Sequence, residues 1–260
     1  MMSNRLLTIS SLDLYQEQNQ LLNNISLYVN KGEVVGLVGL SGSGKSLLSK
    51  SILRLLPPTL EMRKGTIQFE GHDMTNLSER TLSTIRGKRI GLIQQNPMTA
   101  LNPTLTIGKQ LTEGLKYHEK LSGKEAVDRS IELLRAMGIC EPELRMNDLP
   151  CQLSGGMRQR VLIAITFSCK PRLIIADEPT TALDVTTQKH ILQLLTMHCH
   201  NSGTSLLLIT HDLAVVSGVC DRIYVMKEGE IVESGQTKQV FREPKHAYTK
   251  ALLDLRRVRL

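Results

Sequence analysis

The amino-acid sequence predicts an α/β fold that combines a buried parallel sheet, an antiparallel β-region near the N-terminus and an inserted helical segment. Residues 7–15 and 21–29 alternate apolar and polar side chains, which is typical of half-buried antiparallel strands. Residues 173–176 and 205–209 are continuously apolar, as expected for strands of a parallel sheet that is covered on both faces. Between about residues 97 and 153 the strand pattern gives way to helical periodicity.

The length and composition suit one large domain. A chain of 260 residues can bury a sizeable core, and its mean hydropathy is -0.11. The apolar runs are of strand length, well short of the roughly 18–20 residues that a membrane span needs. The first residues lead into an alternating strand rather than into the apolar core of a signal peptide. We therefore expect a protein that is made and kept in the cytoplasm and is free to dock onto a membrane.

Neither the cysteines nor the charge point to a further site. The 5 cysteines form no C-x-x-C pair, which indicates reduced thiols rather than a disulfide framework or a zinc site. His198, Cys199 and His200 would point in different directions on a helix, so a solvated cluster is favoured over a metal site. The net charge is +7, but its cations are dispersed and aromatic residues make up only 3%, so no stacking platform for nucleic acid is predicted.

Turn residues divide the N-terminal part into its elements. A polar turn at residues 16–20 joins the first two strands, and Lys31 and Gly32 turn the chain into the next. A helix is expected to stop at Pro57. The elements are a strand at 33–38, a helix at 47–56 and a strand pair around 65–71.

The middle of the chain is expected to be helical. A strand at residues 90–93 is followed by Pro97 and Pro103, which we expect to exclude regular structure until about residue 107. Helices are then predicted at residues 107–118 and 124–137, and Gly138 ends the second. The apolar stripe of that helix consists of Val127, Ile131, Leu134 and Met137.

An alternation of helices and strands returns after residue 150. The helix that precedes the apolar strand at 173–176 is expected to stop before Pro171. The predicted helices lie at 156–169, 186–199, 213–220 and 240–255, and the further strands at 222–227 and 231–234.

Residues 39–46, G-L-S-G-S-G-K-S, match the phosphate-binding P-loop pattern G-x-x-x-x-G-K-[ST] at every fixed position. They stand between a predicted strand and a predicted helix, so successive N–H groups and the positive helix end can face phosphate oxygens. Lys45 can reach the β- and γ-phosphates, and the Ser46 hydroxyl suits Mg²⁺. We predict that this loop binds a nucleoside triphosphate through Gly39, Ser41, Gly42, Ser43, Gly44, Lys45 and Ser46.

An acidic pair ends the apolar strand at residues 173–176. Asp177 can hold Mg²⁺ through its hydration shell, and Glu178 can polarise a water for attack on the γ-phosphate. The alternative, an acid pair that merely opens a turn before Pro179, is disfavoured because the chain also carries a P-loop.

A second anion site is predicted at residues 153–160, L-S-G-G-M-R-Q-R, where a serine and two glycines open a helix. A chain with one P-loop has no obvious use for a second phosphate-binding site. In a head-to-tail pair of chains this second site has a use, because each chain could present its serine to the nucleotide bound by the other.

The form L-S-G-G-x-x-Q-R resembles the signature motif of ATP-binding cassette (ABC) ATPases, and the resemblance covers essentially the whole chain. It implies that Gln95 contacts Mg²⁺, the attacking water and the membrane subunits, and that His211 contacts the γ-phosphate. Asp184, in A-L-D at residues 182–184, matches the D-loop of the family. Tyr15 matches the aromatic residue that stacks on adenine.

The fold that this resemblance implies is a RecA-like P-loop NTPase core with an antiparallel β-subdomain and an inserted helical subdomain. The resemblance implies that residues 1–260 form a single ATPase domain, with the core at 1–96 and 154–260 and the helical subdomain at about 97–153. It also implies that two subunits sandwich two ATP molecules, with the signature of each facing the nucleotide of its partner. The signature residues are Ser154, Gly155, Gly156 and Gln159.

Residues 95–103 and 243–253 resemble the Q-loop and the tail of ATPases in the peptide/nickel importer subfamily. Peptide-importing members usually continue with a cysteine-bearing C-terminal extension. This chain stops at Leu260, like the shorter ATPases of nickel and metallophore importers. We therefore expect an ATPase subunit that drives the uptake of a metal ion or metal chelate. An oligopeptide or dipeptide importer is the alternative, and a soluble nucleic-acid-associated ATPase or a non-hydrolysing cassette fits the motifs less well.

The resemblance also implies partners and a location. The expected partners are a second, related ATPase in a heterodimer, two transmembrane permeases and an extracytoplasmic substrate-binding protein, without nucleic acid. The chain would act with ATP and Mg²⁺ as a peripheral subunit on the cytoplasmic face of the cell membrane.

Overall fold

The computed structural model describes residues 4–181 and 183–257, and the chain forms two compact units. Unit 1 combines the chain up to Leu82 with the chain from Ser205 onward, and unit 2 is Ser83–Thr204. The predicted boundaries at residues 97 and 153 stay a prediction.

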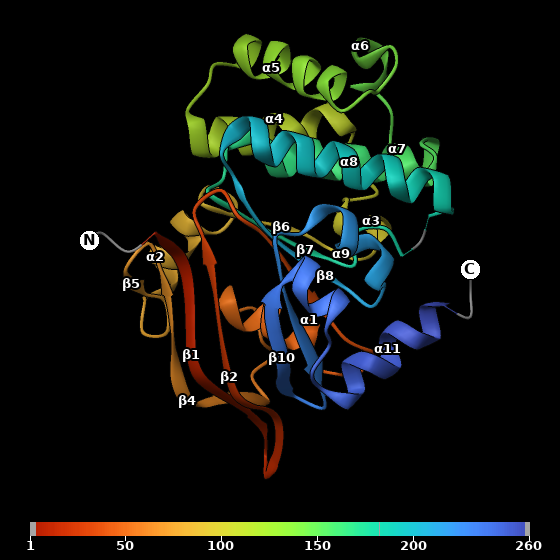
Figure 1. The fold of residues 1–260 in the computed structure, drawn as a ribbon. Helices are drawn as coiled ribbons and strands as arrows, with labels where there is room; N and C mark the ends of the chain where they lie inside the picture. The colour runs from red at the N-terminus through yellow and green to blue at the C-terminus, as the bar shows by residue number, and fades with distance from the viewer. Residues whose placement is uncertain (1–3, 182, 258–260) are drawn as a thin grey trace. The chain divides into compact units, whose positions relative to one another are not determined.

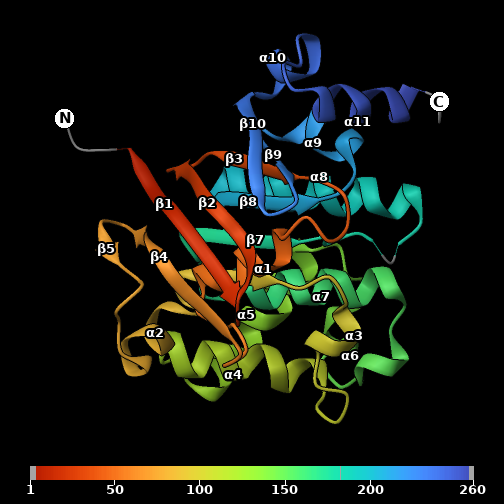
Figure 2. The same cartoon turned by 90° about the horizontal axis from the view of Figure 1, so that it is seen from below.

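An antiparallel sheet in unit 1 confirms the predicted β-region. Its strand order is β2-β1-β4-β5, and Figure 2 shows β1, β2 and β4 side by side. Leu7 and Ile9 alternate with more exposed residues of β1, as predicted, and Leu12 and Leu14 do so again after an irregularity in the register. The bounds are β1 Arg5–Gln16, β2 Asn19–Asn30, β4 Leu60–Phe69 and β5 His72–Asp73.

A mixed sheet in unit 1 carries the strand that leads into the P-loop. The strands follow one another in the order β10-β9-β3-β8, with β3 parallel to β8 and β9, and β10 antiparallel to β9. Every residue of β3 and β8 is buried, as their apolar runs predict. The bounds are β3 Val34–Val38, β8 Ser205–Thr210, β9 Arg222–Lys227 and β10 Glu230–Gln236.

The helices of unit 1 differ from the prediction in two places. Helix α1 (Lys45–Ile52) ends before residue 56, because Arg54 takes the left-handed conformation at φ 50. The predicted helix at 240–255 is two helices, α10 (Thr237–Arg242) and α11 (Ala247–Arg257). Pro244 separates them, since proline lacks an N–H and drives the preceding residue away from helical geometry. The other helix within this unit is α9 (Leu213–Val219), and α2 (Glu79–Ile85) runs across the boundary to unit 2.

Unit 2 combines a parallel strand pair with helices. β6 (Ile90–Ile93) runs parallel to β7 (Leu173–Asp177), and helices α4, α5 and α7 pack on one another (Figure 1). The helical elements are α3 Pro97–Ala100, α4 Ile107–Glu119, α5 Gly123–Ala136, α6 Pro142–Arg145, η1 Pro150–Gln152, α7 Gly155–Ser168 and α8 Val185–Ser202.

Two predictions for this helical region were wrong in detail. Pro97 does not exclude a helix but begins one, because proline is favoured in the first helical turn. Asn96 caps that helix by accepting a hydrogen bond from the Met98 N–H at 2.9 Å. In α5, Val127 is 40% exposed, and the small residues Ala126 and Ser130 are buried instead. The buried stripe therefore starts one position earlier than predicted.

Candidate functional site

The P-loop joins β3 to α1 in unit 1 and has the geometry of a phosphate cradle. Gly42 and Gly44 take left-handed conformations at φ 83 and φ 101, which favour glycine. A Cβ on Gly39 would lie 2.2 Å from the Met226 carbonyl oxygen, so only glycine permits this close approach. Beside Gly42 there is open space within 4 Å, so a ligand can approach the backbone there.

Lys45 is folded back over its own loop. The residue is 4% exposed, and its Nζ donates hydrogen bonds to the carbonyl oxygens of Gly39 and Leu40, both at 2.9 Å. Ser41, Gly42 and Ser46 are exposed around this buried ammonium. The loop thus combines a positive charge with accessible N–H groups and hydroxyls, which fits a polyphosphate.

His211 lies at the same edge of the sheet as the P-loop. The register pairs Val38 with Thr210 in parallel strands, so His211 leaves β8 where Gly39 leaves β3. The Asp212 N–H donates to the Thr210 hydroxyl at 3.0 Å, which holds the turn, and His211 is exposed.

Tyr15 is half-buried on β1 and has an unexpected neighbour. The guanidinium carbon of Arg63 lies 4.5 Å from the centre of the Tyr15 ring, a cation–π contact. An Arg63 N–H also donates to the Glu17 carbonyl oxygen at 2.7 Å. Arg63 could not be predicted from the sequence, because only the pairing of β1 with β4 brings it to this tyrosine.

Unit 2 brings Gln95 and Glu178 together. β6 and β7 are parallel, and Gln95 Nε2 donates to Glu178 Oε2 at 3.0 Å. The Thr181 hydroxyl donates to the same oxygen at 2.9 Å. Asp177 is buried at the end of β7, and Glu178 has a left-handed backbone at φ 47, a conformation that concentrates at functional sites. Thr181 carried no signal in the sequence.

The start of α7 packs against the start of α8, also within unit 2. The Ser154 hydroxyl accepts a hydrogen bond from the Met157 N–H at 3.3 Å and caps α7. A Cβ on Gly156 would lie 3.0 Å from a methyl carbon of Thr187, and one on Gly155 would lie 3.6 Å from Leu183. Gln159 is only 1% exposed, and its Nε2 has no hydrogen-bond partner among the described residues.

Asp184 caps α8. Its Oδ1 accepts a hydrogen bond from the Thr187 N–H at 3.0 Å, and the hydrogen bonds from Thr187 lower the pKa of this carboxyl. Ala182 of the predicted D-loop motif lies outside the described residues.

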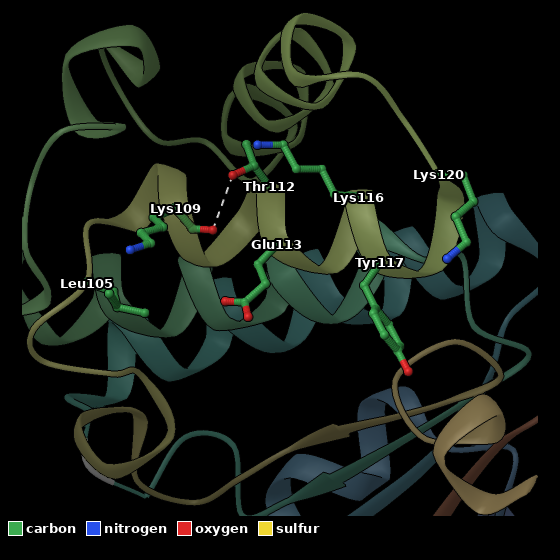
Figure 3. A pocket seen from close by; sticks show the side chains of 7 residues that line it. All are labelled: Leu105, Lys109, Thr112, Glu113, Lys116, Tyr117 and Lys120. Carbon is green, nitrogen blue, oxygen red and sulfur yellow. Dashed lines mark hydrogen bonds between the residues drawn. The ribbon is translucent and has the colours of Figure 1, made fainter. Parts of the chain in front are cut away.

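A groove of about 650 Å³ follows one face of α4 and contains no residue of the predicted site (Figure 3). It is lined by Leu105, Lys109, Thr112, Glu113, Lys116, Tyr117 and Lys120.

The cluster of His198, Cys199 and His200 does not form a metal site among the described residues. Cys199 is buried whereas His200 is exposed, so these consecutive residues face different ways. The described residues contain no group of three or more His, Cys, Asp or Glu that could hold a metal ion, and no helix long and apolar enough to cross a membrane.

Comparisons with known proteins agree with these motifs. The family described as ABC transporter matches residues 22–181. The chain is 48% identical over 254 residues to the oligopeptide transport ATP-binding protein OppD of Bacillus subtilis, covering 96% of this chain and 71% of that protein. It is 51% identical over 233 residues to the probable D,D-dipeptide transport ATP-binding protein DdpD of Escherichia coli, covering 89% of this chain and 71% of that one.

Solved structures share the fold. The dimeric post-hydrolysis state of the ATP-binding cassette MJ0796 bound to ADP and Pi matches with a TM-score of 0.79 at 30% identity, covering 89% of this chain and 98% of that chain. CbiO1 of Clostridium perfringens, part of the transporter complex cbiONQ, matches with a TM-score of 0.81 at 28% identity, covering 98% of both chains.

Proposed function

This chain belongs to the ABC transporter family of ATP-binding proteins, and from that premise we propose that it powers the import of peptides. It is an ATP hydrolase, and it serves an ABC importer that also contains permease subunits and a dimerising ATPase. The observation that carries the ATP-binding assignment is the P-loop, with its left-handed glycines and a buried Lys45 whose ammonium stands over the loop.

The residues of the two units take complementary roles in hydrolysis. Lys45 and the loop N–H groups bind the phosphates, and His211 contacts the γ-phosphate. Glu178 polarises the attacking water. Gln95 and Thr181 hold the Glu178 carboxylate through hydrogen bonds of 3.0 and 2.9 Å, which supports an oriented base.

Mg²⁺ fits the oxygen donors that the chain offers. Ser46 supplies an exposed hydroxyl, Asp177 a carboxylate and Gln95 an amide oxygen, and hard oxygen ligands suit this ion. Bound there, Mg²⁺ would neutralise charge that develops on the phosphates. Tyr15 stacks on adenine.

The start of α7 acts on the nucleotide of a partner subunit. Ser154, Gly155 and Gly156 open this helix with partly exposed backbone, and the ADP- and phosphate-bound cassette MJ0796, a structural neighbour, is dimeric. Gln159, the fourth predicted signature residue, is 1% exposed in the free chain, and its role toward the partner's nucleotide stays a prediction. Asp184 belongs to the same surface.

The cargo proposed here is a peptide, which corrects the expectation of a metal ion. That expectation rested on the end of the chain at Leu260, not on residues that contact cargo. Relatives that are about half identical over most of the chain are named for oligopeptide and dipeptide transport. Sequence identity outweighs chain length as evidence, and a nickel or metallophore cargo has no support.

The proposed complex holds this chain in a heterodimer with a related ATPase, below two permeases that receive peptide from an extracytoplasmic binding protein. The chain then lies on the cytoplasmic face of the membrane as a peripheral subunit, and no nucleic acid takes part.

Purification of the native complex from membranes tests this function. We expect permeases, a second ATPase and a binding protein to accompany the chain, and peptide-loaded binding protein to stimulate ATP hydrolysis. Stimulation by a metal-loaded binding protein would contradict the cargo, and copurification of ribosomes or DNA without permeases would contradict the importer.

A further inference from the structure

A side chain from the C-terminal segment holds the P-loop from outside. The Leu40 N–H donates a hydrogen bond to the hydroxyl of Tyr248 at 3.1 Å, although the two residues are 208 positions apart. Tyr248 lies on α11, and both residues belong to unit 1.

The peptide group that makes this contact is the same one that holds Lys45. The carbonyl oxygen of Gly39 and the N–H of Leu40 belong to one planar peptide unit. Lys45 Nζ donates to that carbonyl oxygen at 2.9 Å, while Tyr248 accepts from the N–H. A rotation of this peptide would therefore move the oxygen that anchors the lysine.

Tyr248 is itself held by a short chain of hydrogen bonds from β10. The carboxylate of Glu233 accepts from the N–H groups of Lys245 and His246 at 2.8 and 3.0 Å. The His246 Nδ1 then accepts from the Tyr248 N–H at 3.1 Å. Burial disfavours the charge of Glu233, but the donated hydrogen bonds outweigh burial, and the pKa of Glu233 is lowered. The turn before α11 is thus fixed to the sheet.

Packing fixes the helix as well. Thr249 and Leu252 are 1% and 8% exposed, and α11 packs on α9. By contrast, Leu40 is 51% exposed, so burial of its side chain contributes little to holding it. The Tyr248 hydroxyl therefore adds an anchor at Leu40, beside the close packing of Gly39 on Met226.

We propose that Tyr248 is a positioning residue for nucleotide binding, which orients the Gly39–Leu40 peptide and, through it, Lys45. The proposal rests on the ATP-binding function proposed above. When the peptide is free to rotate, only a fraction of molecules is competent to bind, and the apparent affinity falls by that fraction. Because coupling between two sites is reciprocal, nucleotide in the P-loop must in turn stabilise the docked α11.

The test compares Tyr248→Phe with Tyr117→Phe, which removes the hydroxyl of a tyrosine that is 62% exposed on α4 of unit 2. For each protein we would measure the affinity for ADP and the hydrogen exchange of α11 amides with and without ADP. Wild type should show slower exchange in α11 when ADP binds. Tyr248→Phe should bind ADP about two- to five-fold more weakly and lose most of that protection, whereas Tyr117→Phe should match wild type.

A second variant weakens the same anchor without changing Tyr248, so it shows whether the effect of Tyr248→Phe comes from this hydrogen-bonded turn or from general damage to the fold. Glu233→Gln keeps the size of the side chain but weakens the anchor of the turn, so it should shift affinity and exchange in the same direction by a smaller factor. Equal ADP affinity and equal α11 protection in Tyr248→Phe and wild type would overturn the role of Tyr248 while leaving ATP binding intact. Failure of wild type itself to bind ADP or ATP would overturn both proposals.

Discussion

The carboxyl ends of the strands carry opposite chemistry in the two units. In unit 1, β3 and β8 lead to the Lys45 ammonium, exposed loop N–H groups and His211. In unit 2, β6 and β7 lead to a glutamine and two carboxylates, with Gln95 bonded to Glu178. Positive groups attract a polyphosphate, and a carboxylate activates water. Variants in unit 1 should therefore change affinity, and variants in unit 2 should change turnover.

The largest effect is expected at Lys45. Lys45→Ala removes the charge beside the phosphates, so ATP should bind about 100-fold more weakly or worse. Lys50→Ala, which removes an exposed lysine from the same helix, is the matched control and should bind ATP like wild type. Titration with a fluorescent ATP analogue measures the affinity of both variants. An equal loss of affinity in Lys50→Ala would mean that any positive charge on α1 attracts ATP and that Lys45 has no specific role.

Gln95 offers the next largest effect, in the other unit. Gln95→Ala removes the hydrogen bond to Glu178 at 3.0 Å, so turnover should fall about ten-fold, while the affinity for ATP measured without Mg²⁺ stays within about two-fold. Steady-state hydrolysis and a binding titration separate the two quantities. A loss of affinity as large as the loss of turnover would break the division between the units.

Thr181 should show a smaller change of the same kind. Thr181→Val keeps the shape of the side chain but removes the hydroxyl that donates to Glu178, and turnover should fall about five-fold. The same substitution at Thr99, an exposed threonine of α3, is the control. Unchanged hydrolysis in Thr181→Val would mean that Gln95 alone orients the glutamate.

The smallest effect is expected from Asp184→Ala, which should lower the free energy of unfolding rather than change ATP binding or turnover. The pKa of Asp184 is lowered from the ordinary value of 3.8, so the carboxylate cap stabilises the fold above that pH and the contribution is lost as the pH falls through the folded pKa. Asp184→Ala should therefore unfold at lower urea than wild type at pH 7. The difference should shrink below about pH 3.8, and a difference that grows in acid would contradict this cap.

Local sequence predicted the cradle because eight consecutive residues carry it. The glycines, Lys45 and Ser46 act within one loop, so their pattern needs no knowledge of the rest of the chain. The apolar run at residues 205–209 predicted a buried strand of a parallel sheet, and β8 indeed runs parallel to β3. The order of the strands was not predicted.

Contacts between distant segments could not be predicted in this way. Arg63 reaches Tyr15 and Tyr248 reaches Leu40 only after the strands and helices have packed. Pro97 was misjudged for a different reason, since proline ends a helix from within but begins one at its first position. The prediction of a metal cargo rested on the end of the chain at Leu260, and the relatives named for peptide transport do not support it.

The most direct test of the division between the units is to measure ATP affinity and ATP turnover together in Glu178→Gln. Glu132→Gln, a matched change at an exposed glutamate of α5, serves as the control. We expect Glu178→Gln to keep its ATP affinity within about two-fold of wild type and to lose about 100-fold or more of turnover, because a general base is removed. Retained turnover, or a parallel loss of affinity, would contradict it.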